Sequence, residues 1–205
     1  MNLAYNVSFF NCKFKNSESE VDADASLIKG DFLHVTSTSK VFIKNSSFIN
    51  GVAKIGGAIY MLGDTDVMIS SSLFTFNSAQ YGGAISGVTI GSLTITEGSS
   101  FIANQAIYGQ GDAIHLANLQ SAFVLNDTKF YNGTPSNFIY INSGAMLNMS
   151  RVEFSALKST FPFITSKYGG VLLIDVLKLH IQASKFINLF GTGNGGAIFM
   201  SELES

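Results

Sequence analysis

The chain contains no tryptophan, one cysteine, two prolines and few charges. Only 13% of its 205 residues are charged, and the formal net charge is -2. The single Cys12 excludes an internal disulfide framework, and the charge balance provides no attraction to nucleic acid. No apolar run is long enough to span a bilayer, and the N-terminal residues lack the basic and apolar regions of a signal peptide.

Apolar and small residues are abundant instead. The composition is 46% hydrophobic, with 18 Phe and 20 Gly, which excludes a disordered chain and predicts a sizeable core. Five Asn-X-Ser/Thr sequons are compatible with an extracellular or cell-surface location. The sequons begin at Asn6, Asn45, Asn126, Asn132 and Asn148.

A four-residue element recurs along the chain. Gly-Gly-Ala-Ile stands at 56–59, 82–85 and 195–198, and the variant Gly-Asp-Ala-Ile stands at 111–114. A phenylalanine recurs with a mean spacing of about 29 residues, which is typical of one coil of a solenoid. The recurring phenylalanines are Phe14, Phe48, Phe74, Phe101, Phe130, Phe154 and Phe186.

A pair of alternating apolar residues precedes each of these phenylalanines, as Val41 and Ile43 precede Phe48. Such alternation predicts a strand with one buried face. Together with the Phe segment and the Gly-Gly-Ala-Ile segment, it gives three short strands per coil. The sequence therefore predicts an all-β fold, a parallel β-helix of about seven coils that forms one repeat array over 1–205. An antiparallel sandwich is the alternative, but it would not repeat the same residue in the same position seven times.

Each repeated residue type suits one position in a coil. Phenylalanines are expected to stack inside, and a small residue two positions before each Phe suits a tight corner. The double glycines suit a corner that needs positive φ and has no room for Cβ. They are Gly56, Gly57, Gly82, Gly83, Gly195 and Gly196. An asparagine two or three residues after the Phe is expected to form an amide ladder. These asparagines are Asn16, Asn50, Asn77, Asn104, Asn132 and Asn188.

Gly-Gly-Ala-Ile combined with Phe-X-X-Asn, as at 74–77 and 101–104, resembles the repeat of the chlamydial polymorphic outer membrane proteins. The coils at Phe48, Phe130 and Phe186 depart from it, because they carry Phe-X-Asn. The resemblance implies a pectin-lyase-like β-helix, and the right-handed sense comes from it alone. It also implies a secreted or surface-displayed stalk, adhesive in some members, and we expect this chain to be a segment that continues into further repeats.

Enzymes with this fold act on sugars and need carboxylates that converge on one outer face, commonly beside a basic residue. Here the acids are scattered along the sequence, and the only arginine, Arg151, is expected in a turn. Asp112 with His115 is a weak candidate for a glycosidase corner, and a tolerated substitution is the simpler interpretation. We therefore assign no catalytic residue and no cofactor, and a polysaccharide lyase or glycoside hydrolase remains the alternative function.

Metal binding has equally little support. The loop after Phe14 carries Glu18, Glu20, Asp22 and Asp24, which form a weak candidate for a Ca²⁺ loop. A solvated acidic loop is the simpler interpretation. The three histidines lie too far apart in the repeat to form a metal site.

The residue after each Gly-Gly-Ala-Ile aliphatic is expected to point outward. These residues form a file of mostly aromatic and imidazole groups: His34, Tyr60, Ser86, His115, Tyr140, Leu172 and Phe199. An exposed file of this kind is a candidate platform for glycans or for another surface protein. The alternatives are that a loop or a neighbouring chain covers it, or that these residues simply support β propensity. The sequence thus favours a non-enzymatic structural or adhesive segment of a surface or secreted protein.

Overall fold

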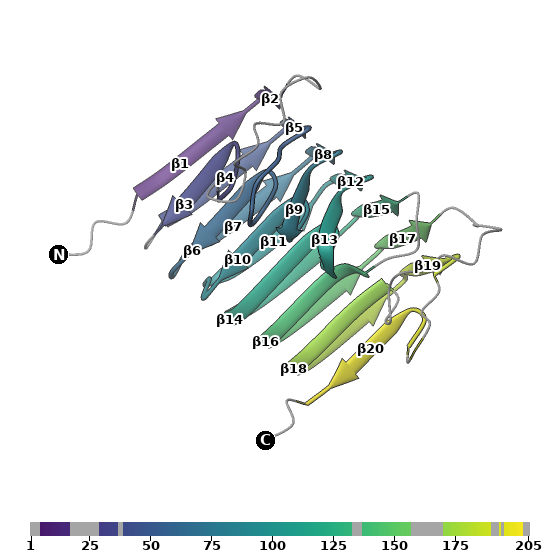
Figure 1. Cartoon of the computed structure of the whole chain (residues 1–205). Coiled ribbons are helices and arrows are strands. Elements are labelled where there is room, and N and C mark those ends of the chain that lie inside the picture. Colours follow the sequence, from purple (N-terminus) through teal and green to yellow (C-terminus); the bar gives the residue numbers. More distant parts are fainter. Residues whose placement is uncertain are drawn as a thin grey trace.

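The computed structural model describes residues 5–16, 29–36, 39–132, 137–156, 170–189, 193 and 195–202. In this part of the chain every element is a β-strand, and parallel strands stack into a β-solenoid of about five turns (Figure 1). The predicted all-β parallel fold is confirmed. The expected count of about seven coils is slightly too high. It takes each recurring phenylalanine as one coil, but the described residues around some of these phenylalanines do not close a full turn.

Three parallel sheets run along the solenoid axis. The largest has eleven strands: β1 (Tyr5–Phe10), β3 (Leu33–Thr36), β4 (Ser39–Lys44), β6 (Ile59–Leu62), β7 (Asp66–Ser70), β10 (Ile85–Val88), β11 (Ser92–Thr96), β14 (Ile114–Asn126), β16 (Asn137–Ser150), β18 (Gly170–Gln182) and β20 (Ile198–Ser201). The Phe segments form a seven-stranded sheet: β2 (Lys13–Lys15), β5 (Ser47–Ile49), β8 (Leu73–Thr75), β12 (Ser100–Ile102), β15 (Lys129–Asn132), β17 (Glu153–Ala156) and β19 (Lys185–Ile187). The third sheet contains only β9 (Ser78–Tyr81) and β13 (Gln105–Gln110).

The expectation of three short strands in every coil is wrong for the later coils. There the Gly-Gly-Ala-Ile strand and the apolar-pair strand merge into β14, β16 and β18, which have 13, 14 and 13 residues. They merge because the linkers between them also pair, with Leu119 beside Gly144 and Gly144 beside Val176. The corresponding linkers of the earlier coils lie outside the strands, so β6 and β7 remain separate.

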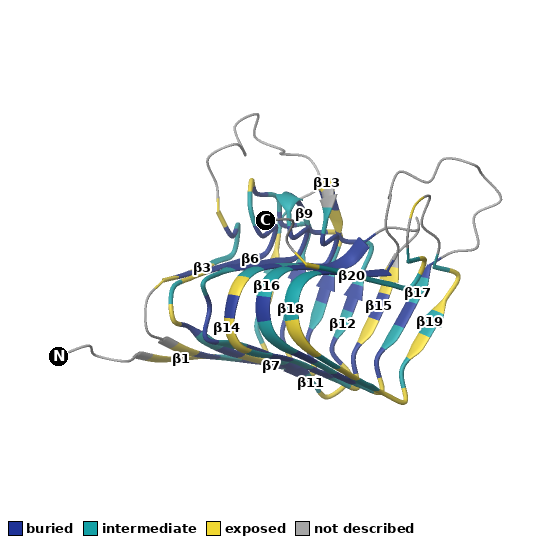
Figure 2. Ribbon diagram, turned by 90° about the horizontal axis from the view of Figure 1, so that it is seen from below, coloured by how far each residue is buried: buried dark blue, intermediate teal, exposed yellow. Residues whose placement is uncertain are grey.

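The seven phenylalanines form one continuous stack, as predicted. Neighbouring ring centroids lie 4.7 to 5.2 Å apart, and the rings are within 14° of parallel. This spacing matches the distance between adjacent strands in a sheet. Phe48, Phe74 and Phe154 have no exposed surface. Both main layers of strands contain buried residues (Figure 2), and their side chains form one hydrophobic cluster.

The small residue before each Phe does more than fit a tight corner. The hydroxyl of Ser72 accepts a hydrogen bond from the backbone N–H of Ser46 at 3.1 Å and donates one to the Ser70 carbonyl at 2.8 Å. The N–H of Ser72 in turn donates to the Ser99 hydroxyl at 3.2 Å. The residue just before this serine has positive φ, for example 47° at Ser71. The hydroxyl ladder therefore satisfies backbone groups at a strained bend.

The double-glycine corner has the predicted conformation. Gly56 and Gly82 both have a φ of 63°. A Cβ on Gly57 would collide with the carbonyl oxygen of Gly83 in the next coil, and a Cβ on Gly83 would collide with that of Asp112. The first glycine is thus required for its conformation, and the second for the close approach of the next coil.

The amide ladder is shorter than predicted. Asn104 Oδ1 accepts hydrogen bonds from the backbone N–H and from Nδ2 of Asn77, at 3.0 and 2.9 Å, and both side chains are buried. Asn50 and Asn188 lie one position earlier in the repeat, at residues with φ of 60° and 55°, and donate to a backbone carbonyl of the preceding coil. The expectation is therefore wrong for these two, because Phe-X-Asn places the amide one residue before the ladder.

Replacing Asn104 by Ala should lower the free energy of unfolding by at least about 2 kcal/mol, measured by chemical denaturation. Removal of the side chain leaves the Asn77 amide donors and the Phe74 carbonyl, to which Asn104 Nδ2 donates at 3.0 Å, without that partner. Each unsatisfied buried polar group costs about 1–3 kcal/mol. The control is Gln105→Ala at the adjacent exposed position, and an equal loss in both variants would contradict the prediction.

Strands β9 and β13 were not expected from the sequence. They follow the amide ladder and stand above the layer that contains β6 and β16 (Figure 2). Their inward residues are small and buried: Ala79 on β9 is 1% exposed and Ala106 on β13 is 5% exposed. Ala53 takes the equivalent place in the preceding coil, outside the strands, and is 4% exposed. This column of alanines was the available signal, but strands of so few residues give no clear apolar alternation.

Candidate functional site

The predicted outward file forms in register but is largely covered. Residues 34, 60, 86, 115, 140, 172 and 199 pair one with the next across the largest sheet. Tyr60, Ser86 and Tyr140 are buried, at 4%, 0% and 7% exposure, whereas His34 is exposed. His115 and Phe199 are partly buried, and the Leu172 side chain lies outside the described residues. The expectation of an exposed platform is therefore wrong for Tyr60, Ser86 and Tyr140.

Neighbouring segments cover these rings. The Lys29 ammonium lies 5.4 Å above the centre of the Tyr60 ring, and the His34 ring lies edge-on to it at 5.0 Å. Tyr81, at the end of β9, places its ring 5.7 Å from that of His115. Burial raises the pKa of Tyr60. Two side chains from outside the file, Lys29 and Tyr81, therefore lie against it, and Tyr81 belongs to the small third sheet.

Ser86 and His115 form a buried polar pair within this file. The Ser86 hydroxyl lies 3.2 Å from His115 Nδ1, and the imidazole stacks on Tyr140 at 5.2 Å with the rings 5° from parallel. Burial lowers the pKa of His115 to about 4, so the imidazole is neutral at pH 7. A serine beside a neutral histidine resembles a nucleophile and its base. Because Ser86 has no exposed surface, this pair has a structural role.

Asp112 is directed at the backbone. It occupies the place of the second glycine in its coil, and its Oδ1 accepts a hydrogen bond from the Ala106 N–H on β13 at 2.8 Å. Asp112 is buried. A carboxylate that binds an edge N–H protects that edge of the small sheet from unwanted pairing. The geometry favours the structural interpretation of Asp112 over a glycosidase corner.

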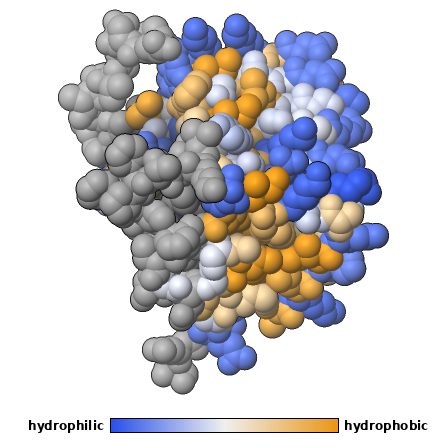
Figure 3. Space-filling model, turned by 90° about the vertical axis from the view of Figure 1, so that its right-hand side faces the viewer, coloured by the Kyte–Doolittle hydropathy of each residue, from blue (hydrophilic) through white to orange (hydrophobic). Residues whose placement is uncertain are grey.

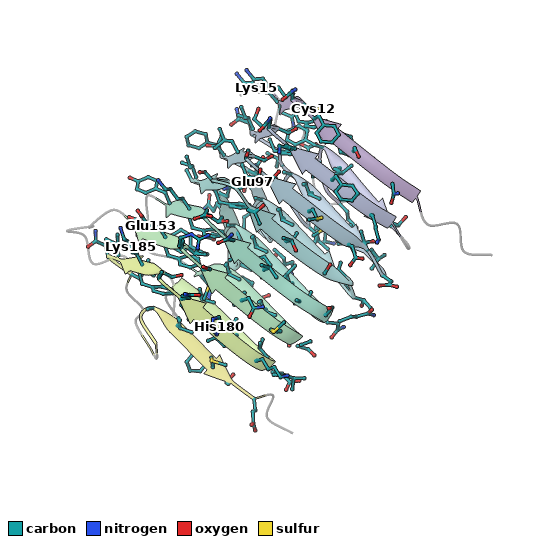
Figure 4. The ribbon with its side chains drawn as sticks, turned by 180° about the vertical axis from the view of Figure 1, so that it is seen from behind. Cys12, Lys15, Glu97, Glu153, His180 and Lys185 are labelled. Atoms are coloured by element: carbon teal, nitrogen blue, oxygen red, sulfur yellow. The ribbon has the colours of Figure 1, made fainter. Side chains whose placement is uncertain are left out.

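A groove on the outside brings together charges that are scattered in the sequence. Its volume is about 400 Å³, and we call it the charged groove. Its charged residues are Asp127, Lys129, Arg151, Glu153 and Lys185. Lys129, Glu153 and Lys185 occupy the same register position on β15, β17 and β19. Figure 4 shows Glu153 and Lys185 side by side on neighbouring strands.

One wall of the charged groove is a bidentate ion pair. Arg151 Nε lies 2.6 Å from Asp127 Oδ1, and its Nη2 donates to Asp127 Oδ2 at 2.9 Å and to Asn126 Oδ1 at 2.7 Å. The hydrogen bond from Arg151 holds the pKa of the Asp127 carboxyl below its usual value. The sequence predicts a turn at Arg151 but gives no sign of its contact with Asp127. Corners of successive coils, 24 residues apart, become neighbours only when the coils stack.

The remaining candidates that the structure describes form no site. Within the described ranges no group of three His, Cys, Asp or Glu side chains could hold a metal ion. The acidic loop with Glu18, Glu20, Asp22 and Asp24 lies outside these ranges. Asp66 accepts a hydrogen bond from Ser92, and Asp175 stands at a linker bend with a φ of 55°. The described residues also contain no helix long and apolar enough to cross a membrane.

Comparisons with family models, with curated proteins and with solved structures found no match for this chain. The resemblance to polymorphic outer membrane protein repeats therefore stays a prediction, and so does the right-handed sense that it implies. The parallel β-solenoid itself follows from strand order and register.

Proposed function

We propose that this chain is a non-enzymatic structural or adhesive segment of a cell-surface or secreted protein, built as a stiff rod. The observation that carries the proposal is the unbroken stack of seven phenylalanines, with adjacent rings 4.7 to 5.2 Å apart. Each coil contacts the next through the same residues, so the array resists bending and places its outer faces at fixed spacings. Such a rod suits a stalk or a repetitive binding surface.

Two further features support this function. Five sequons and a surface with few charges suit an extracellular protein. In the last coil Leu179, Ile181 and Phe186 remain partly exposed, and apolar surface gathers on the side of the molecule where β17 and β19 lie (Figure 3). Contact with another surface at this end would bury these side chains, which suits a structural or adhesive segment.

The charged groove is the adhesive surface that we propose, with a glycan or another surface protein as partner. We prefer it to the file that contains Tyr60 and Tyr140 as the binding surface, because those two residues are buried. Its lysines, glutamate and ion pair offer donors and acceptors on a rigid support, which favours binding of polar groups. Lys129 and Lys185 are exposed and flank Glu153.

Incubation with a panel of polysaccharides, with and without Ca²⁺, should give binding to at least one glycan without new reducing ends or unsaturated products. Substituting Lys129→Ser together with Lys185→Ser should weaken that binding at least tenfold, about 1.4 kcal/mol, because two ammonium donors are lost. Lys13→Ser is the matched control, since Lys13 occupies the same register position on β2, away from the groove. Equal binding in the double variant and the control would reject the groove as the adhesive surface.

A carbohydrate-active enzyme is the second candidate function. The charged groove favours it, because Asp127 and Glu153 bring two carboxyl groups, the pair that sugar cleavage needs, to one outer face beside basic residues. The same incubation decides between the two functions. Cleavage products that disappear in Glu153→Gln would establish the enzyme and reject the non-enzymatic rod.

A further inference from the structure

The five sequons are equivalent in the sequence but not in the structure. Asn126 is already engaged, because its Oδ1 accepts a hydrogen bond from Arg151 Nη2 at 2.7 Å. The hydroxyl of Thr128, which completes that sequon, is buried and donates to the carbonyls of Asn126 and Ile95 at 3.1 and 3.3 Å. A sugar on Nδ2 of Asn126 would therefore lie beside the guanidinium that forms one wall of the charged groove.

Two other sequons are less favourable or incomplete in the structure. Asn148 is partly buried within β16, in a row between Val124 and His180 on the outer face of the largest sheet. The sequon at Asn132 extends into residues that lie outside the described ranges. Asn6 is exposed, on β1.

Asn45 presents an open corner. It lies between β4 and β5 with a φ of 50°, and its side chain is exposed. The middle residue of the sequon, Ser46, is buried in the hydroxyl ladder at 2% exposure, whereas Ser47 is partly exposed. The corner thus turns Ser46 inward and leaves the side-chain amide of Asn45 exposed to solvent. Ser47, whose hydroxyl completes the sequon, is also partly accessible.

The neighbours of Asn45 leave room for a large substituent. The corresponding corner residues of the coils on either side are Asn11 and Ser71, which are small, polar and exposed. Main-chain hydrogen bonds join this corner to the coils on either side: the Asn11 N–H donates to the Lys44 carbonyl, and the Asn45 N–H donates to the Ser70 carbonyl, both at 3.1 Å. These bonds use main-chain atoms only, so a modified Asn45 side chain would leave them intact.

We propose that Asn45 is an N-glycosylation site of this protein, an inference that rests on the proposed extracellular function. The donor would be a lipid-linked diphosphate oligosaccharide, and the transferase that of the secretory pathway. Nδ2 of Asn45 forms a bond to the anomeric carbon while the bond from that carbon to the diphosphate oxygen breaks. The amide loses one proton, and the lipid diphosphate leaves with the bonding electron pair and takes up a proton. A glycan on Asn45 would extend from the turn between β4 and β5, away from the flat faces of the two main sheets.

The test is site-resolved glycopeptide mass spectrometry of the full chain, secreted from a glycosylating eukaryotic cell behind an added cleavable leader. Most secreted molecules should carry a glycan on Asn45. Asn45→Gln and Ser47→Ala should each remove one glycan per molecule, the second variant while retaining the asparagine. Asn126→Gln, the matched control at the equivalent region of a later coil, should leave the glycan on Asn45 in place.

An unmodified Asn45 in the secreted, folded protein would overturn the proposal, and so would higher occupancy at Asn126 than at Asn45. The added leader separates this result from the proposed function. If the native protein is found inside the cell while the leader-fused chain is modified at Asn45, the surface function fails and the acceptor assignment stands.

Discussion

Replacing Phe101 by Ala should lower the free energy of unfolding by about 3–5 kcal/mol, the usual cost of removing a buried aromatic ring. Phe101 is 1% exposed and stacks on Phe74 at 4.8 Å and on Phe130 at 4.9 Å. Its loss removes contacts on both sides and leaves a cavity that the parallel strands cannot close, because their spacing is fixed by backbone hydrogen bonds. Chemical denaturation measures the loss.

Phe101→Leu is the matched control for this prediction. Leucine keeps most of the apolar volume but loses the ring stacking, so the expected loss is about 1–2 kcal/mol. If Phe101→Ala costs no more than Phe101→Leu, the stack does not hold neighbouring coils together. The phenylalanine stack would then no longer support the proposal that the chain is a stiff rod.

Acidification from pH 6.5 to pH 4 should destabilise the fold through His115. Burial lowers the pKa of this imidazole from 6.5 to about 4, so the unfolded chain binds the proton more tightly than the folded one. The stabilisation that comes from the neutral imidazole is therefore fully present above pH 6.5. Below pH 6.5 the free energy of unfolding falls by about 1.4 kcal/mol per pH unit, and the loss reaches about 3 kcal/mol near pH 4. Thermal and chemical unfolding across this range measure the effect.

His115→Gln should flatten the pH dependence between pH 6.5 and 4, whatever its effect on stability at neutral pH. His180→Gln is the control on exposed β18 surface, and it should keep the wild-type slope because His115 is retained. The pKa of Asp127 is also lowered, so its ion pair is lost at still lower pH and acts in the same direction. An unchanged slope in His115→Gln would show that the imidazole is not buried as a neutral group.

The sequence was most informative about positions that every coil repeats. The phenylalanine, the apolar pair and the double glycine occupy equivalent places because parallel stacking gives each of them the same surroundings, coil after coil. The strand register can therefore be predicted from the repeat itself: Phe48 pairs with Phe74, and Phe74 pairs with Phe101. The amide ladder was overestimated because a shift of one residue, from Phe-X-X-Asn to Phe-X-Asn, moves Asn50 from the ladder to a left-handed corner.

The sequence by itself determined the parallel β-solenoid, its inner columns and the conformation of the glycine corner, because these depend on residues that recur at one spacing. Only the tertiary structure decided what covers the outside and which irregular residues meet. Lys29 covers the Tyr60 ring and Tyr81 lies beside His115, because segments outside the strands of the file lie over that face. Asp127 and Arg151 form their ion pair because stacking makes neighbours of corners that the chain separates by a whole coil. Such contacts depend on the path of the chain between repeats, which a periodic pattern leaves unspecified.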